Sequence, residues 1–141
     1  FILGDINDRV VLEQVFTAHD FDAVMHFAAF TEVGESVLDP LKYYQNNVVG
    51  TLTLLKAMLR HKVDKFIFSS SAAVYGEPDE TPIVEAHPCR PTSPYGWTKL
   101  LIEKMLADFE TAHGLRWAAL RYFNAAGGRP DRKQRLRRSR P

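Results

Sequence analysis

Apolar residues gather in short runs that alternate with amphipathic stretches along the chain. Residues 21–30 (FDAVMHFAAF) form a nearly continuous apolar run, which predicts a strand buried on both faces, as in a parallel sheet. Residues 66–69 and 117–122 predict two further strands, and residues 1–5 (FILGD) predict a buried strand that ends in a polar tip. Residues 76–94 are rich in proline and charge, which predicts a surface loop.

Between these runs, apolar residues recur at helical spacing. The first such stretch follows Asp8, a suitable N-cap, and the second follows Asp39, with Pro40 at the first-turn position that proline favours. A third helix is predicted over residues 94–113, with Gly114 as its C-terminal stop.

Strand and helix therefore alternate at least three times, with no hairpin signal and no internal repeat. This order predicts an α/β fold with a doubly wound, parallel, Rossmann-like sheet joined by right-handed crossovers. Ligands bind beyond the carboxyl ends of the strands in such sheets. Small and polar residues follow the predicted strands at 4–6, 28–31, 69–71 and 123–124.

The composition of the 141 residues, 45% hydrophobic and 25% charged, is that of one ordinary globular domain. A single cysteine, Cys89, excludes a disulfide framework within the chain and favours a reducing cytoplasm. No window approaches 18 apolar residues, so we expect no membrane partner. The five histidines lack metal-ligand spacing, so we predict no metal site and interpret His26 as a core residue.

The net charge of +1 conceals an asymmetry. Residues 129–141 hold seven of the 18 basic residues and one of the 17 acidic residues, which leaves an acidic body with 11 basic and 16 acidic residues. The segment 128–141 has no apolar periodicity, so we interpret it as a disordered or aberrant tail rather than an arm that binds nucleic acid.

Tyr95 and Lys99 are the first candidate chemical pair. They stand four residues apart near the start of the third helix and so share one face. A nearby ammonium and a helix N-terminus both favour the phenolate form of a tyrosine. A hydroxyl from the serines at 69–71 could join them, which predicts a general acid–base group.

The ordered motifs GDI, HFAAFTEVGES, PLxYYxNNVxGT, KFIFSSSAAVYG, SPYGWTK and LRYFNAAG resemble the extended short-chain dehydrogenase/reductase family over residues 1 to about 127. The resemblance is strongest to members that epimerise nucleotide sugars. It implies NAD-dependent epimerisation at C4 of a UDP-hexose, UDP-glucose or UDP-galactose, through a 4-keto intermediate in galactose metabolism.

The same resemblance implies the role of each site residue. The catalytic residues would be Tyr95 as the base, Lys99 and Ser71. The residues implied to bind NAD are Asp5, Ile6, Phe27, Ala28, Ala29, Phe30, Thr31, Asn47, Ser71, Tyr95, Lys99 and Phe123. Those implied to bind the UDP-sugar are Ser71, Tyr95 and Asn124.

The chain departs from the family pattern in two ways. Some members carry lysine where this chain has Thr31, which supplies a hydrogen bond but no charge. The resemblance also places the family's glycine-rich turn upstream of Phe1 and a region that closes over UDP after residue 127. We therefore expect residues 1–127 to be the central part of the Rossmann-like domain, without the first βαβ unit and the C-terminal substrate region.

Several alternatives stay open. A 4,6-dehydratase needs extra carboxyl groups beside the active serine, and none follows SSSAAVYG until Glu77. A uronate epimerase, a decarboxylase and an inactive fragment are the others. Glu32 and Glu35 are candidate helix-start residues. For a full-length parent we expect a homodimer that pairs through residues 40–61 and 94–113.

Overall fold

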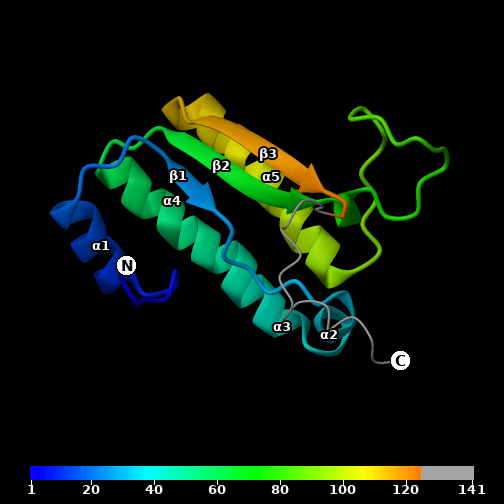
Figure 1. Cartoon of the computed structure of the whole chain (residues 1–141), viewed down its shortest axis with the longest axis horizontal. Helices are drawn as coiled ribbons and strands as arrows, with labels where there is room; N and C mark the ends of the chain where they lie inside the picture. Colours follow the sequence, from blue (N-terminus) through cyan, green and yellow to red (C-terminus); the bar gives the residue numbers. More distant parts are fainter. Residues whose placement is uncertain (125–141) are drawn as a thin grey trace, which may run out of the picture.

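The computed structural model describes residues 1–124, and the predicted tail at 128–141 lies outside them. Three parallel strands form one sheet in the order β1 (Val24–His26), β2 (Lys65–Ser71) and β3 (Arg116–Tyr122) (Figure 1). The parallel alternation of strand and helix predicted from the sequence is therefore confirmed.

The helical elements are α1 (Arg9–Ala18), α2 (Val33–Leu38), α3 (Pro40–Tyr43), the π-helical turn η1 (Tyr44–Val49), α4 (Gly50–Arg60), the 3₁₀ turn η2 (Ala72–Val74) and α5 (Pro94–His113). The predicted caps are confirmed, because the Asp8 carboxylate accepts from two N–H groups of α1 and the Asp39 carboxylate accepts from Lys42 N. Gly114 ends α5 with a φ of 71°, a left-handed conformation that glycine adopts without steric cost. Glu32 precedes the first residue of α2, as its interpretation as a helix-start residue requires.

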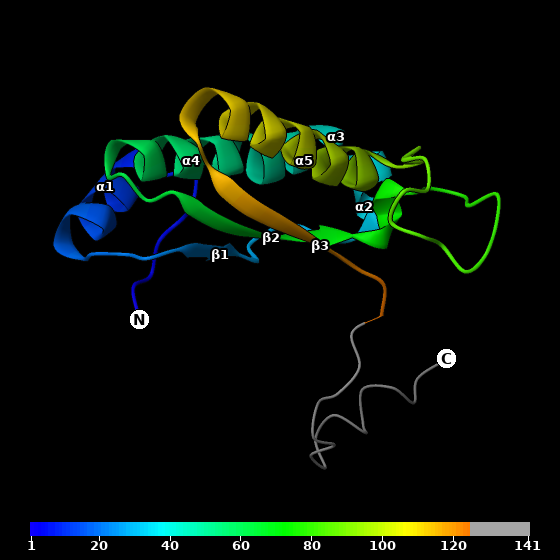
Figure 2. The same cartoon turned by 90° about the horizontal axis from the view of Figure 1, so that it is seen from above.

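The helices lie on one side of the sheet (Figure 2). Helices α4 and α5 run side by side over it, and α1 packs against α4. The core between these layers consists of Phe16, Leu54, Leu55, Ala57, Met58, Val63, Phe66, Phe68, Ile102, Leu106 and Leu115. This packing orients α5 and holds its first turn at the carboxyl end of β2.

Two strand predictions are wrong within residues 1–124. Only 24–26 of the run 21–30 is a strand, and Met25 and Phe27 are 59% and 56% exposed. Successive strand side chains point to opposite faces, and the helices cover only one face, so half of the run stays uncovered. Residues 1–5 form no strand, because an apolar run needs a neighbouring strand and none of the described strands pairs with it.

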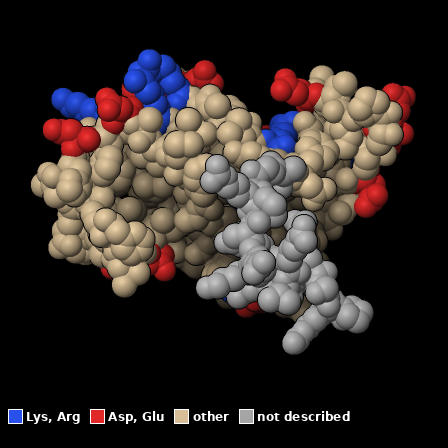
Figure 3. Space-filling view, in the orientation of Figure 1, with Lys and Arg blue, Asp and Glu red and all other residues tan. Residues whose placement is uncertain are grey.

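The part of the uncovered sheet face that Figure 3 leaves visible is largely free of charge. Figure 3 shows this side, where Lys, Arg, Asp and Glu lie mainly at the rim around the visible uncharged surface. No helix within residues 1–124 is both long enough and apolar enough to cross a membrane.

Candidate active site

The carboxyl ends of the parallel strands and the first turn of α5 meet at one edge of the sheet (Figure 1). Strand β2 ends at Ser71, which lies opposite Tyr122 of β3. Strand β1 ends at His26, opposite Phe68 of β2. The polar strand ends that predicted a ligand site are therefore neighbours in space.

The first turn of α5 is fixed by two serine side chains. Pro94 has no N–H, the Tyr95 N–H donates to Ser36 Oγ at 3.1 Å, and the Gly96 N–H donates to Ser93 Oγ at 3.1 Å. These bonds satisfy amide groups that lack a partner within the helix. The backbone of Tyr95 is thus set by contacts from both sides of the helix start.

Gly96 brings the tyrosine turn against the serine turn. A Cβ atom at this position would lie 2.6 Å from the carbonyl oxygen of Ala73, closer than atoms can approach. The Ser71 hydroxyl accepts from the Ala73 N–H at 3.2 Å and begins η2. The absence of a side chain at Gly96 therefore lets the turns that carry Ser71 and Tyr95 touch.

Lys99 lies one helical turn after Tyr95 and is only 3% exposed. Its Nζ donates to the backbone oxygen of Ser69 at 2.7 Å and lies 4.9 Å from the ring centre of Phe68 and 5.8 Å from that of Tyr95. Burial disfavours the charged amine and lowers the pKa of Lys99 to about 8. The lysine is therefore anchored to the end of β2 beneath the tyrosine.

His26 is a buried, hydrogen-bonded core residue. Its Nε2 lies 2.9 Å from Thr51 Oγ1, and its ring stacks on Phe68 with 6.0 Å between ring centres. Burial, followed by the charge of Lys99, lowers the pKa of His26 to about 4, so the ring is neutral at pH 7. No metal-binding group of three His, Cys, Asp or Glu side chains occurs within residues 1–124.

The loop at 27–31 follows β1 and presents two exposed rings. Asn47 holds the Phe30 peptide, because its Oδ1 accepts from Phe30 N at 2.9 Å and its Nδ2 donates to Phe30 O at 3.1 Å. The Phe30 ring lies 4.4 Å from Lys42 Nζ and 5.8 Å from the ring centre of Tyr43. The loop is therefore fixed through Phe30 rather than free.

Ile6 lies against the same helical segment as this loop, and Asp5 precedes it in the chain. The Asp5 carboxylate accepts from the Asn7 N–H at 2.8 Å and from Asn7 Nδ2 at 3.0 Å, and these bonds lower the pKa of Asp5. The Ile6 side chain packs closely on Gly50, the first residue of α4. The π-helical turn before Gly50 also carries Asn47, so both predicted cofactor segments contact one stretch of helix.

Phe123 and Asn124 directly follow β3 at the same sheet edge. The Phe123 ring is exposed and stacks on the Tyr75 ring at an interplanar angle of 29°, with 6.2 Å between ring centres. Asn124 is exposed beside it. Residues 123–124 therefore follow a strand at this edge of the sheet, as the sequence predicts.

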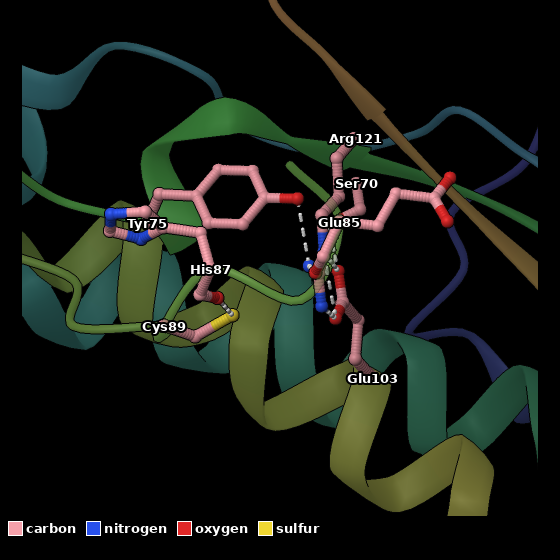
Figure 4. A network of polar contacts seen from close by, with 7 residues as sticks. All are labelled: Ser70, Tyr75, Glu85, His87, Cys89, Glu103 and Arg121. Carbon is pink, nitrogen blue, oxygen red and sulfur yellow. Dashed lines mark hydrogen bonds and ion pairs between the residues drawn. The ribbon is translucent and has the colours of Figure 1, made fainter. Parts of the chain in front are cut away.

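Next to the serine turn lies a partly buried ion pair that joins α5 to β3, in which Glu103 is the buried partner (Figure 4). Arg121 Nη2 donates to Glu103 Oε2 at 2.6 Å, and Ser70 Oγ donates to Glu103 Oε1 at 2.6 Å. Arg121 also donates to the Tyr75 hydroxyl at 3.0 Å and to Glu85 O at 3.3 Å. The bond to Glu103 raises the pKa of Arg121, so the guanidinium stays charged.

The structure thus brings Ser71, Tyr95 and Lys99 to one place, with the loop 27–31 linked to them through Asn47. Their chemical roles stay predictions. Sequence reasoning missed Ser36, Thr98 and Glu103. Only Glu103 had a signal, because Tyr95, Lys99 and Glu103 recur every four residues on one helical face.

The fold and this site define a Rossmann-like protein of the extended short-chain dehydrogenase/reductase type. A family model described as GDP-mannose 4,6 dehydratase matches residues 1–138, and the chain belongs to that family.

Similar proteins narrow the resemblance further. A UDP-glucose 4-epimerase of Halalkalibacterium halodurans is 56% identical over 131 residues, which are 93% of this chain and 39% of that protein. The crystal structure of UDP-glucose 4-epimerase from Brucella ovis in complex with NAD is 51% identical, with a TM-score of 0.88 over 92% of this chain and 40% of that one. The Bifidobacterium longum UDP-glucose 4-epimerase, solved with NAD⁺ and UDP, is 48% identical, with a TM-score of 0.85 over 87% and 37%. The chain spans about 40% of the length of the relatives it matches.

Proposed function

We propose that this chain supplies the catalytic part of an NAD-dependent enzyme that epimerises C4 of a UDP-hexose, converting UDP-glucose and UDP-galactose into each other in galactose metabolism. The observation that carries the proposal is the contact between the Ser71 turn and the first turn of α5, with Lys99 anchored beneath Tyr95. The identity of 48–56% to UDP-glucose 4-epimerases supports it.

The residues at the sheet edge fit a dinucleotide. Exposed rings in the loop 27–31 offer an apolar surface, and Lys99 uses one N–H donor on Ser69 O, which leaves others without a partner within residues 1–124. NAD would be held by these groups together with Asp5 and Ile6. When bound, NAD supplies a hydride acceptor that is regenerated in each cycle.

The chain's own residues would manage the sugar hydroxyl. The Ser71 oxygen is oriented by the Ala73 N–H and can hydrogen-bond the 4-hydroxyl. Tyr95, as a phenolate stabilised by the Lys99 ammonium, would accept the proton of that hydroxyl, and the resulting phenol would later return it. Asn124 would contact the UDP-sugar while the 4-keto intermediate rotates in the pocket to present its other face.

The disposition of carboxylates favours epimerisation over 4,6-dehydration, which needs free acid–base carboxyl groups. Glu103 is buried and bound to Arg121 and Ser70. Glu35 is bound to Lys42 and the Tyr43 hydroxyl at 2.5 and 2.8 Å. Both side chains are thus committed to structural partners.

A chimera tests the proposal, since the chain spans about 40% of its relatives. In it, residues 1–124 replace the matching segment of the Halalkalibacterium halodurans UDP-glucose 4-epimerase. We expect the chimera to retain NAD and to convert UDP-galactose into UDP-glucose, measured by chromatography of the UDP-sugars. A folded chimera that retains NAD but yields from UDP-galactose a product lighter by one water, or no product, would refute C4 epimerisation.

We also propose that a full-length protein pairs through residues 40–61 and 94–113, the second of which form α5. Trp97 and Leu101 stand four residues apart on α5 and are 47% and 40% exposed, and Val49 is exposed on the neighbouring η1. Sedimentation of the chimera as a monomer at micromolar concentration would contradict the pairing.

For the location of the enzyme we propose a reducing cytoplasm, which fits a chain with a single cysteine.

A further inference from the structure

The main chain of Tyr95 is held at both its N–H and its C=O by side-chain hydroxyls. The N–H donates to Ser36 Oγ at 3.1 Å, and the C=O accepts from Thr98 Oγ1 at 2.7 Å. Both hydroxyls are fully buried. The backbone of this residue is therefore fixed more tightly than helix formation alone requires.

The Thr98 hydroxyl connects this helix to Asn47. Asn47 Nδ2 donates to Thr98 Oγ1 at 3.2 Å and to Phe30 O at 3.1 Å, and its Oδ1 accepts from Phe30 N and from Asn46 Nδ2. Two donors and two acceptor positions are the full capacity of an amide side chain. Because Asn47 is also only 1% exposed, its amide has nothing left to offer a ligand.

Ser36 makes a second connection between the same two regions. It lies on α2, which begins two residues after the loop 27–31, and its Oγ also donates to Val33 O at 2.6 Å. The loop and α2 are consequently joined to the first turn of α5 at two points, one through Asn47 and Thr98 and one through Ser36.

We propose that Asn47, Thr98 and Ser36 are positioning residues that lock the loop 27–31 to the backbone of Tyr95. Asn47 acts on the cofactor side through the peptide of Phe30 and not by touching the dinucleotide. Displacement of the loop is then transmitted to the tyrosine turn. The catalytic role of Tyr95 rests on the proposed function, whereas the linkage itself is a property of the fold.

Amide hydrogen exchange in the 141-residue chain, followed by NMR, tests the linkage without any activity. Thr98→Val keeps the shape of the side chain but removes the hydroxyl. We expect exchange of the Phe30 amide to rise about fivefold, the value of one hydrogen bond of about 1 kcal/mol. The Phe66 amide in β2 reports global opening and should change less than twofold. Ser36→Ala, the milder variant, should raise exchange selectively at Tyr95.

Two variants serve as matched controls. Thr98→Ser keeps the hydroxyl and should leave Phe30 exchange within about twofold of wild type. Thr111→Val removes a hydroxyl that donates to Ala107 O at 3.1 Å on an exposed turn of the same helix, and should change neither amide. Unchanged exchange at Phe30 in Thr98→Val, or an equal rise at Phe66, overturns the linkage. So does unchanged exchange at Tyr95 in Ser36→Ala.

The chimera supplies the functional arm. A positioning role predicts that Thr98→Val lowers kcat about tenfold while KM for UDP-galactose changes less than twofold, because the bound substrate is misaligned rather than lost. An equal loss in Thr98→Ser, or a change in KM alone, contradicts that role. If amide exchange responds as expected but the chimera is inactive, the proposed function fails and the linkage stands. If the chimera is active but amide exchange does not respond, only the linkage is refuted.

Discussion

Replacing Lys99 by methionine should stabilise the fold at neutral pH. The side chain is almost fully buried, and its pKa falls from 10.5 to about 8. At about 1.4 kcal/mol for each factor of ten in an equilibrium constant, this difference corresponds to about 3 kcal/mol. The folded chain therefore carries the charge of Lys99 at a cost of about 3 kcal/mol below pH 8.

The pH dependence follows from the same difference. Between pH 8 and 10.5 the unfolded chain holds the proton of Lys99 and the folded chain has released it. The free energy of unfolding of the wild type therefore rises across this window, by about 3 kcal/mol in all. Lys99→Met cannot show this rise. Near pH 10.5 the two proteins should agree to about 1 kcal/mol, the value of the lost bond to Ser69 O.

Urea unfolding followed by tryptophan fluorescence at pH 7 to 10.5 measures both effects. Lys104→Met is the matched control, because Lys104 is an exposed lysine on the same helix and its loss should change stability by less than about 0.5 kcal/mol. In the chimera, Lys99→Met should also abolish turnover, so that stability and activity move in opposite directions. A Lys99→Met variant less stable than wild type at pH 7 would show that burial of this charge is not costly.

Three further changes probe the surroundings of the site. Since burial lowers the pKa of His26 from 6.5 to about 4, wild type should lose about 3 kcal/mol of stability as pH falls through this window, and urea titrations of His26→Leu should not show this loss. Gly96→Ala should cost about 1–3 kcal/mol in the same assay, because the new Cβ meets Ala73 O at 2.6 Å; an unchanged midpoint would mean that the two turns are not in contact. Arg121→Met should cost about 3–5 kcal/mol by leaving Glu103 buried and unpaired, and adding Glu103→Leu should restore most of it; a double variant as unstable as the single one would refute that cause.

Much of the fold could be predicted because the signals are local. The caps at Asp8 and Asp39, the stop at Gly114 and the apolar spacing of the helices depend only on neighbouring residues. Burial of strands was not predictable in this way. The runs 1–5 and 21–30 are apolar, but what covers or pairs with a strand is decided by distant elements, and within residues 1–124 the helices cover one face.

The residues of the candidate site also differ in whether a local sequence pattern reveals them. Tyr95 and Lys99 are recognisable because their spacing on a helix is a local pattern. Ser36 and Asn47 act on residues 59 and 51 positions away, through hydroxyl and amide groups that are unremarkable in sequence. The π-helical turn that carries Asn47 also leaves no clear trace in the spacing of apolar residues.

Turnover of the chimera with Tyr95→Phe tests the central claim most directly. The substitution removes only the phenolic oxygen, and Tyr44→Phe makes the same change at an exposed position on η1. We predict that Tyr95→Phe lowers conversion of UDP-galactose to UDP-glucose by at least about 100-fold with bound NAD unchanged, as expected for loss of a general acid–base group. Tyr44→Phe should stay within about twofold of the parent chimera. Conversion by Tyr95→Phe within twofold of the parent chimera would contradict the assignment of Tyr95 as the base.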